Sequence, residues 1–172
     1  GELILHMKKN KHIRRVDGLG SLRRMVTTIG DIDIAVSSDY KYSSEVIKHF
    51  LAFPRKSSTI NAGNKKASIF VSPGIRVDLR VQEAKNYGSM LQYFTGSKDH
   101  NIRLREYALK KRLSLSEWGL KSLKGDKKLH EFPSEESLYK FLGLQYIPPE
   151  IREGTNEIEI AKTNNIPKFV EL

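Results

Sequence analysis

The sequence predicts an α+β fold, in which a mixed or antiparallel sheet with helices on one side precedes a smaller α+β unit. Two stretches carry this prediction, DIDIAV at 31–36 and RVDLRV at 76–81, because apolar and charged residues alternate along both. Such alternation is typical of strands with one buried and one polar face. A helical run from Ala84, interrupted at Gly96-Ser97 and followed by short strand-like pieces, indicates the second unit.

The first half of the chain is expected to alternate between helices and strands, with turns at glycine- and proline-containing pairs. In order, we expect a short amphipathic helix over 1–12, a strand over 13–20 entering the Gly20-Ser21 turn, a helix over 21–28, a strand over 31–37, a helix capped by Ser43 or Ser44 and ended by Pro54, and strands separated by turns at Gly63-Asn64 and Pro73-Gly74.

The second half predicts two helices that meet near Gly96-Ser97, short strands around Gly119, and a helix capped by Ser134. Pro148 and Pro149 are expected to end this ordered body, leaving a polar, partly extended tail. The domains expected are therefore 1–86, 87–153 and a tail or linker over 154–172.

The amino-acid composition limits the classes of partner, site and cellular location that this protein can have. The formal net charge is +10, with 30 basic and 20 acidic residues, and this suits a polyanionic partner. The absence of cysteine excludes disulfides and thiolate zinc sites. No apolar run reaches the length of about 18 residues that a membrane span needs, and no signal peptide is visible, so we expect a cytoplasmic protein. Gly1 in place of an initiating methionine suggests a piece of a longer chain.

The stretch GSLRRMVTTIGDID, at 20–33, combines three features suited to a nucleoside triphosphate. A Gly-Ser turn at a helix start exposes backbone N–H groups to an anion. Arg23 and Arg24 in the first helical turn oppose the helix dipole unless a phosphate lies between them. Asp31 and Asp33 point to the same side of a strand, where oxygen ligands suit Mg²⁺ or Mn²⁺.

Asp78 lies in a second alternating strand, RVDLRV. One interpretation is an antiparallel strand with a solvated face. The interpretation that we favour places this strand beside DIDIAV, so that Asp78 is a third carboxylate held ionised by its flanking arginines.

These motifs resemble the palm of the family X DNA polymerases, the group that includes polymerase beta. GSLRR, TIGDID and RVDLRV match the palm of this nucleotidyltransferase fold, and YFTGSKDHNIRLR, SEWGL and LGLQYIPPEIRE resemble the C-terminal subdomain that closes over the incoming nucleotide. The resemblance covers almost the whole chain. The family's N-terminal helical domain is not part of this sequence, so we expect no lyase activity and weak DNA binding. At the other end, IPKFVEL resembles the linker that precedes a PHP domain in prokaryotic members of the family.

The resemblance also implies roles for individual residues. The catalytic metal ligands would be Asp31, Asp33 and Asp78, holding two Mg²⁺ ions for which Mn²⁺ can substitute. The other residues implied are Ser21, Arg24 and Gly30 at the phosphates, Tyr93, Phe94 and Gly96 at the sugar, Asn101 at the base, Arg105 at the template strand, and Arg76 at Asp78 and the primer end.

The reaction implied is template-directed addition of a deoxynucleotide to a DNA 3′ end, with short-gap filling in base-excision repair as the usual role. The expected partners are gapped or primer–template DNA and a dNTP. We expect the protein to be a monomer that does not bind a membrane. Two alternatives stay open: a template-independent nucleotidyltransferase with the same palm, and a DNA-binding fragment without catalytic activity.

Overall fold

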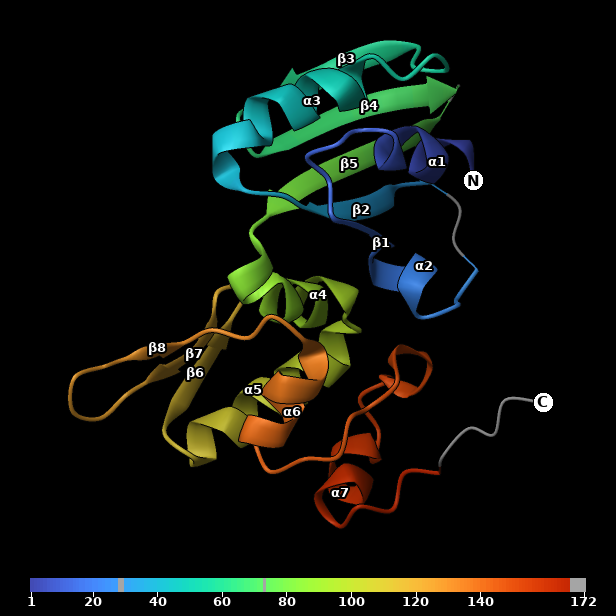
Figure 1. Cartoon of the computed structure of the whole chain (residues 1–172). Helices are drawn as coiled ribbons and strands as arrows, with labels where there is room; N and C mark the ends of the chain where they lie inside the picture. The colour runs from blue at the N-terminus through green and yellow to red at the C-terminus, as the bar shows by residue number, and fades with distance from the viewer. Residues whose placement is uncertain (28–29, 73, 168–172) are drawn as a thin grey trace.

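The computed structural model describes residues 1–27, 30–72 and 74–167. Two units follow each other along the chain (Figure 1). The N-terminal unit contains a five-stranded sheet with helices α1 to α3, and the C-terminal unit contains helices α4 to α7 with a three-stranded sheet. This arrangement confirms the predicted α+β class.

The sheet of the N-terminal unit has the strand order β1-β2-β5-β4-β3. β2 and β5 pair in parallel at its centre, and the other neighbours pair antiparallel, so the sheet is mixed, one of the two arrangements predicted. The strands are β1 (Arg15–Gly18), β2 (Ile32–Ser37), β3 (Ser58–Ala62), β4 (Lys66–Ser72) and β5 (Ile75–Gln82).

Helices cover this sheet because the strands alternate as the sequence predicts. Alternate apolar residues of β2 and β5 join a core with residues of α1 (Glu2–Lys8) and α3 (Ser43–Leu51), including the buried Met7 and Phe50. The helix expected over 21–28 is shorter. α2 (Gly20–Arg23) is a single turn, and Met25 two residues beyond it has a positive φ of 61°, a conformation that side chains with a Cβ seldom adopt and that prevents the helix from continuing.

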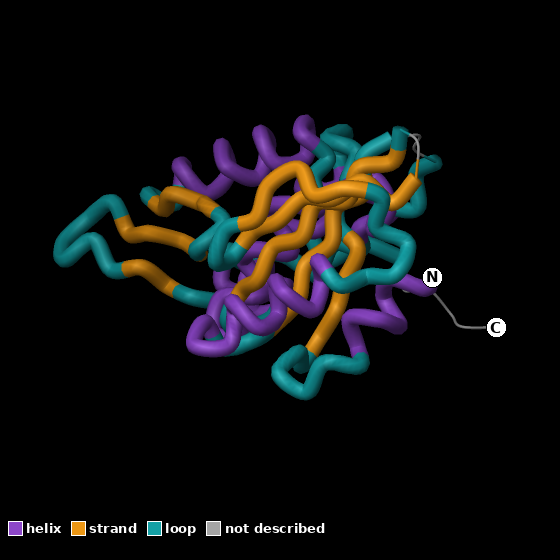
Figure 2. The backbone as a smooth tube through the Cα atoms, turned by 90° about the horizontal axis from the view of Figure 1, so that it is seen from above, coloured by secondary structure: helices purple, strands orange, loops and turns teal. Residues whose placement is uncertain are grey.

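The C-terminal unit follows the predicted order of helices and short strands, and the helical run breaks at Gly96-Ser97 as expected. Figure 2 shows a hairpin of this unit reaching beyond the body of the protein. The elements are α4 (Tyr87–Thr95), α5 (Lys98–Lys110), β6 (Leu113–Ser116), β7 (Gly119–Ser122), β8 (Leu129–His130), α6 (Glu135–Phe141) and α7 (Glu157–Lys162), with 3₁₀ turns η1 (Tyr40–Tyr42), η2 (Ala84–Asn86) and η3 (Pro149–Ile151).

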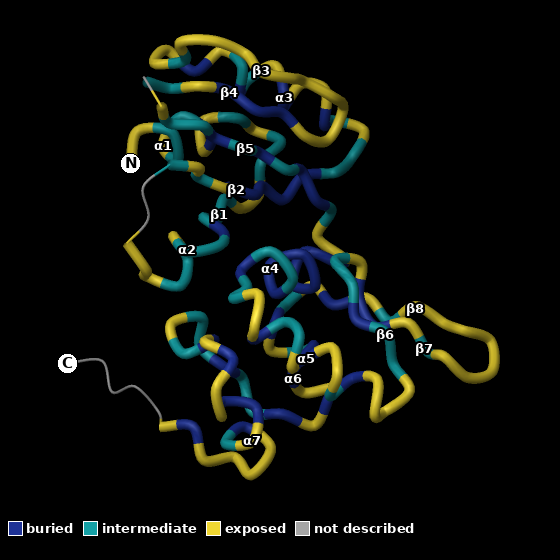
Figure 3. The backbone as a smooth tube through the Cα atoms, turned by 180° about the vertical axis from the view of Figure 1, so that it is seen from behind, coloured by how far each residue is buried: buried dark blue, intermediate teal, exposed yellow. Residues whose placement is uncertain are grey.

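The segment after Pro149 is not the extended tail that the sequence suggested. It forms α7, and Ile158, Ala161 and Ile166 belong to the core of the C-terminal unit. Figure 3 shows buried backbone reaching into this segment. The apolar spacing in EIEIA is short and interrupted by charges, so its burial was hard to read from sequence. Whether residues 168–172 continue as a linker lies outside the described residues.

None of the helices within the described ranges is long and apolar enough to cross a membrane.

Gly88 is predicted to be essential for packing α4 against the start of α6. A Cβ at this position would lie 2.2 Å from the backbone carbon of Ser134. Alanine normally stabilises a helix relative to glycine, but here we expect Gly88→Ala to lower the free energy of unfolding by about 1–3 kcal/mol through overpacking. Urea denaturation measures this. Gly63→Ala, whose Cβ would meet nothing closer than 3.5 Å, is the control, and equal stability of the two variants would contradict the prediction.

A buried network around Glu157 predicts sensitivity to acid. Burial by itself raises the pKa of Glu157, but hydrogen bonds from His100 and from backbone N–H groups outweigh it and bring the pKa to about 2. His100 Nδ1 lies 2.8 Å from one carboxylate oxygen, and the N–H of Gly154 lies 2.7 Å from the same oxygen. A carboxyl whose pKa is lowered in the folded state stabilises the fold above its unfolded pKa of about 4.5, and this stability is lost as the pH falls towards 2.

Glu157→Gln should therefore flatten the fall in unfolding free energy between about pH 4.5 and 2. Urea denaturation at several pH values would test this. Glu159→Gln, which changes an exposed carboxyl in the same helix, should leave the pH dependence as in the parent protein. Parallel pH curves for the parent and Glu157→Gln would refute the prediction.

Candidate active site

Two acidic side chains face each other at the centre of the larger sheet. Asp33 of β2 lies directly opposite Asp78 of β5 in the parallel register. The neighbouring residues Ile34 and Leu79 point into the core, so both carboxylates lie on the other face. The structure thus confirms that the two charged strands are adjacent, as the sequence suggested for Asp78.

The electrostatics at Asp33 reflect this meeting of carboxylates. Partial desolvation raises the pKa of Asp33, although this residue stays exposed, and the negative charges of Asp78 and Asp31 raise it further, while Arg80 and Arg76 act in the opposite direction. Carboxylates held close together repel unless a cation neutralises them. A divalent cation with a preference for oxygen ligands is therefore a chemically fitting group for this site.

The three predicted metal ligands are brought together only in part. Asp31 is exposed just before β2, and its charge reaches Asp33. Within residues 1–27, 30–72 and 74–167, no three acidic, histidine or cysteine side chains converge closely enough to form a metal site. The pair Asp33 and Asp78 is formed by the fold, whereas the full set of three carboxylates stays a prediction.

Asp78 is held by two neighbours. Arg76 Nε donates to Asp78 Oδ1 at 3.0 Å, and Ser68 Oγ donates to the same oxygen. Arg76 also reaches Ser68 Oγ at 3.3 Å. In the described part of the chain Oδ2 has no hydrogen-bond donor, which leaves it available to a cation. Sequence reasoning identified Arg76 but missed Ser68, whose place opposite Asp78 depends on the pairing of β4 with β5.

A pocket of about 280 Å³ opens over the two carboxylates. Its cationic lining residues are Lys66, Arg76 and Arg80. Arg80 also stacks on the ring of Phe94, 3.5 Å from its centroid, and approaches Glu117 at 3.5 Å. The same pocket is thus lined by carboxylates that can bind a metal cation and by basic side chains that can bind an anion. This combination suits a phosphate compound with a bound metal ion. Arg80 was not singled out from the sequence beyond its alternation in RVDLRV.

The Gly-Ser turn lies next to this pocket. Gly20 has a φ of +56°, and a Cβ on it would lie 3.8 Å from Asp33 Oδ2 and 4.0 Å from the carbonyl oxygen of Phe94. Ser21 follows in the single turn of α2. Gly30, which precedes Asp31, has a φ of 122° that glycine adopts readily. Thr28 and Ile29, in the segment between α2 and Gly30, lie outside the described residues.

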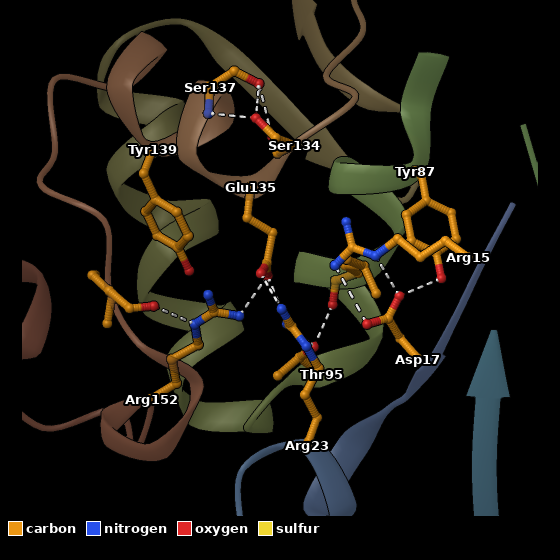
Figure 4. A network of polar contacts seen from close by, with 12 residues as sticks. Arg15, Asp17, Arg23, Tyr87, Thr95, Ser134, Glu135, Ser137, Tyr139 and Arg152 are labelled. Atoms are coloured by element: carbon orange, nitrogen blue, oxygen red, sulfur yellow. Dashed lines mark hydrogen bonds and ion pairs between the residues drawn. The ribbon is translucent and has the colours of Figure 1, made fainter. Parts of the chain in front are cut away.

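The two arginines of GSLRR have different surroundings, which corrects the expectation that both face a phosphate. Arg23 contacts Glu135 of α6 and donates to Thr95 Oγ1 at 2.7 Å (Figure 4). Arg24 Nη1 instead donates to the carbonyl oxygen of Thr95 at 2.5 Å. It would lie 3.0 Å from a Cβ on Gly96. Both arginines thus contact Thr95 at the end of α4, but of the two it is Arg24 that lies beside Gly96, at the junction between α4 and α5.

That junction contains the remaining predicted residues. Tyr93 and Phe94 are half-buried and meet edge to face with ring centroids 5.1 Å apart, and Phe94 packs against the buried cluster that includes Leu91 of α4. Asn101 Nδ2 donates to the carbonyl oxygen of Tyr93 at 2.7 Å, and Asn101 Oδ1 accepts from Gln92 at 2.9 Å. Arg105 lies exposed one turn further along α5. Base and template contacts for these two residues stay predictions.

Comparison with known proteins agrees with this geometry. The family model for the DNA polymerase beta thumb matches residues 90–153. The chain is 36% identical to the DNA polymerase/3′-5′ exonuclease PolX of Bacillus subtilis over 160 residues, which is 92% of this chain and 28% of that protein.

It is also 28% identical to DNA polymerase lambda of Rattus norvegicus over 159 residues, 78% of this chain and 28% of that protein. The chain thus spans a little over a quarter of the length of these relatives. The acidic pair on parallel strands, the Gly-Ser turn beside it and the matched thumb occur in one chain. The chain belongs to the family X DNA polymerases.

Proposed function

We propose that this chain is the part of a DNA-directed DNA polymerase that adds a deoxynucleotide to a primer 3′ end. The observation that carries the proposal is the pairing of Asp33 with Asp78 beneath a pocket lined by cationic side chains. The names of the relatives, both DNA polymerases, support the same reaction class.

Asp31, Asp33 and Asp78 would hold two Mg²⁺ ions, which Mn²⁺ can replace. Such ions, when bound, lower the pKa of the attacking hydroxyl and neutralise charge on the phosphates. The chain's own residues then have positioning roles. Arg76 and Ser68 hold Asp78 through Oδ1, which would leave Oδ2 for a cation. Gly20 leaves the backbone close to Asp33 because it lacks a side chain.

The remaining contacts of the proposal belong to the nucleotide and the DNA. Arg24 would leave the carbonyl of Thr95 to bind a phosphate, since a charge-assisted bond to phosphate is stronger than one to a neutral carbonyl. The assignments are Ser21, Arg24 and Gly30 to the triphosphate, Tyr93, Phe94 and Gly96 to the sugar, Asn101 to the base, Arg105 to the template, and Arg76 to the primer end.

The wider role that we propose is short-gap filling in base-excision repair by a monomer in the cytoplasm. The division into a palm over 1–86 and a closing subdomain over 87–153 belongs to the same proposal. The net charge of +10 suits DNA as the partner.

Primer extension on a one-nucleotide-gapped template, with each dNTP in Mg²⁺ and in Mn²⁺, tests the proposal. Insertion of only the complementary nucleotide is the expected result. Extension without regard to the template would favour the template-independent alternative. A DNA-binding fragment without catalytic activity would be favoured if the chain binds DNA but neither extends the primer nor binds dNTP and metal.

A further inference from the structure

A fully buried glutamine of α4 contacts a residue of the candidate active site. Gln92 is 0% exposed, and its Nε2 donates to Asn101 Oδ1 at 2.9 Å. Asn101 in turn donates from Nδ2 to the carbonyl oxygen of Tyr93 at 2.7 Å. Glutamine is mostly found on protein surfaces, and a buried polar side chain is expected to have a hydrogen-bonding role. The burial of Gln92 therefore calls for a physical explanation.

The two hydrogen bonds of Asn101 determine which way round its amide lies. A backbone carbonyl can only accept, so the atom of Asn101 that faces the carbonyl of Tyr93 is the nitrogen. The amide oxygen then faces Gln92, which must present its own N–H group. Because an amide nitrogen carries two hydrogens, one N–H of Asn101 is left for a further partner.

Gln92 lies among other buried polar groups. Burial raises the pKa of Tyr139 in α6, and the nearby amide of Gln92 acts in the opposite direction. The Tyr139 hydroxyl lies 3.0 Å from Nε2 of the fully buried His100. Within the ranges that the structure describes, the amide oxygen of Gln92 has no hydrogen-bond partner. An unpartnered buried oxygen destabilises a fold, so stability does not explain a glutamine here, whereas its N–H group has a partner in the site.

We propose that Gln92 is a positioning residue that keeps an N–H of Asn101, and not its oxygen, available to the base of the incoming nucleotide, an inference that rests on the proposed function. Asn101 is half-buried near the start of α5, so its amide can meet a ligand. At the minor-groove edge every base has an acceptor, N3 in purines and O2 in pyrimidines, and guanine alone adds a donor. An N–H thus suits all four nucleotides, whereas an oxygen would suit one.

The test uses an adenine nucleotide without this acceptor. 3-Deaza-dATP has a C–H group in place of N3 but keeps the edge that pairs with thymine. Insertion kinetics opposite thymine give kcat and KM for dATP and for 3-deaza-dATP. The variant Gln92→Met removes the donor and keeps a side chain of similar length. The control Ser89→Ala removes another fully buried polar group of α4, whose Oγ has no hydrogen-bond partner among the described residues.

We expect the parent and Ser89→Ala to prefer dATP over 3-deaza-dATP about tenfold in kcat/KM, and Gln92→Met to prefer it only about twofold. The change should lie in the KM for dATP, with kcat close to that of the parent. In an Asn101→Ala background, Gln92→Met should have no further effect, whereas a merely structural role would lower activity in both backgrounds. A tenfold preference in Gln92→Met, or equal use of both nucleotides by the parent, would overturn the inference.

A second measurement does not depend on polymerase activity. In the protein without DNA, the NMR order parameter of the Asn101 side-chain amide should be lower in Gln92→Met than in the parent and in Ser89→Ala. Equal order parameters in the three proteins would overturn the positioning role. A lowered order parameter without nucleotide insertion by the parent would count against the proposed polymerase activity and leave the positioning of Asn101 standing.

Discussion

Asp33→Ala is expected to lower the rate of nucleotide addition by about 10³-fold or more, which corresponds to about 4 kcal/mol in activation free energy. The reason is that Asp33 faces Asp78 across the central strand pair, so its loss leaves one of the two facing carboxylates. Single-turnover primer extension in Mg²⁺ measures the effect. Asp39→Ala changes a carboxylate beyond the other end of β2, paired with Arg14 at 3.4 Å, and should keep the parent rate.

Removing the charge of Asp33 is expected to stabilise the metal-free protein, although it abolishes activity. Because the pKa of Asp33 is raised in the folded state, its charge destabilises the metal-free fold at neutral pH, and this effect disappears as the pH falls below the unfolded pKa. Asp33→Asn should therefore melt at a higher temperature than the parent at pH 7 in EDTA. Adding Mg²⁺ should raise the melting temperature of the parent more than that of the variant. A lower melting temperature for Asp33→Asn in EDTA would show that this carboxylate is not under repulsion.

Glu135→Ala is expected to lower the free energy of unfolding by about 3–5 kcal/mol. Glu135 is 3% exposed and lies between Arg23 of α2 and Arg152, which is fully buried (Figure 4). Arg152 Nη1 donates to Glu135 Oε2 at 2.7 Å. Both arginines lower the pKa of Glu135 although burial alone raises it, so the carboxylate is charged. Its removal leaves a buried guanidinium without its counterion.

Urea denaturation of Glu135→Ala is compared with that of Glu2→Ala. Glu2 forms an exposed pair with Arg55 at 2.8 Å, and exposed pairs contribute at most about 1 kcal/mol. A loss of similar size in both variants would refute the argument from burial. Because Arg23 belongs to the N-terminal unit and Arg152 to the C-terminal unit, the variant should also weaken the cooperativity between them.

The strands and the acidic pair were predictable because their signal is local. In DIDIAV and RVDLRV, alternation determines which side chains share a face of the sheet, although Ala35 on the carboxylate face is buried as well, in a second cluster with residues of α4. The pairing of Asp33 with Asp78 needed one further step, the resemblance to a known fold, since no local rule says which strands are neighbours.

Other features depended on contacts between distant segments. Arg23 and Arg24 are adjacent and chemically equal in sequence, yet one joins Glu135 and the other the carbonyl of Thr95. Nothing near them in the chain distinguishes the two, because the partners lie about 70 and 110 positions further on. Ser68 and the packing of Ile158 were missed for the same reason.

The parallel pairing of β2 with β5 also has a consequence for the kinetics of folding. Asp33 and Asp78 are 45 positions apart in the sequence, and α3 and the β3–β4 hairpin lie between β2 and β5 along the chain. Closing such a loop costs entropy before any contact is gained, so pairing of this kind is slow. During refolding, the local helices should therefore appear in circular dichroism before any metal-binding capacity does, and the acidic pair should be absent from every partly folded species that lacks the central strands.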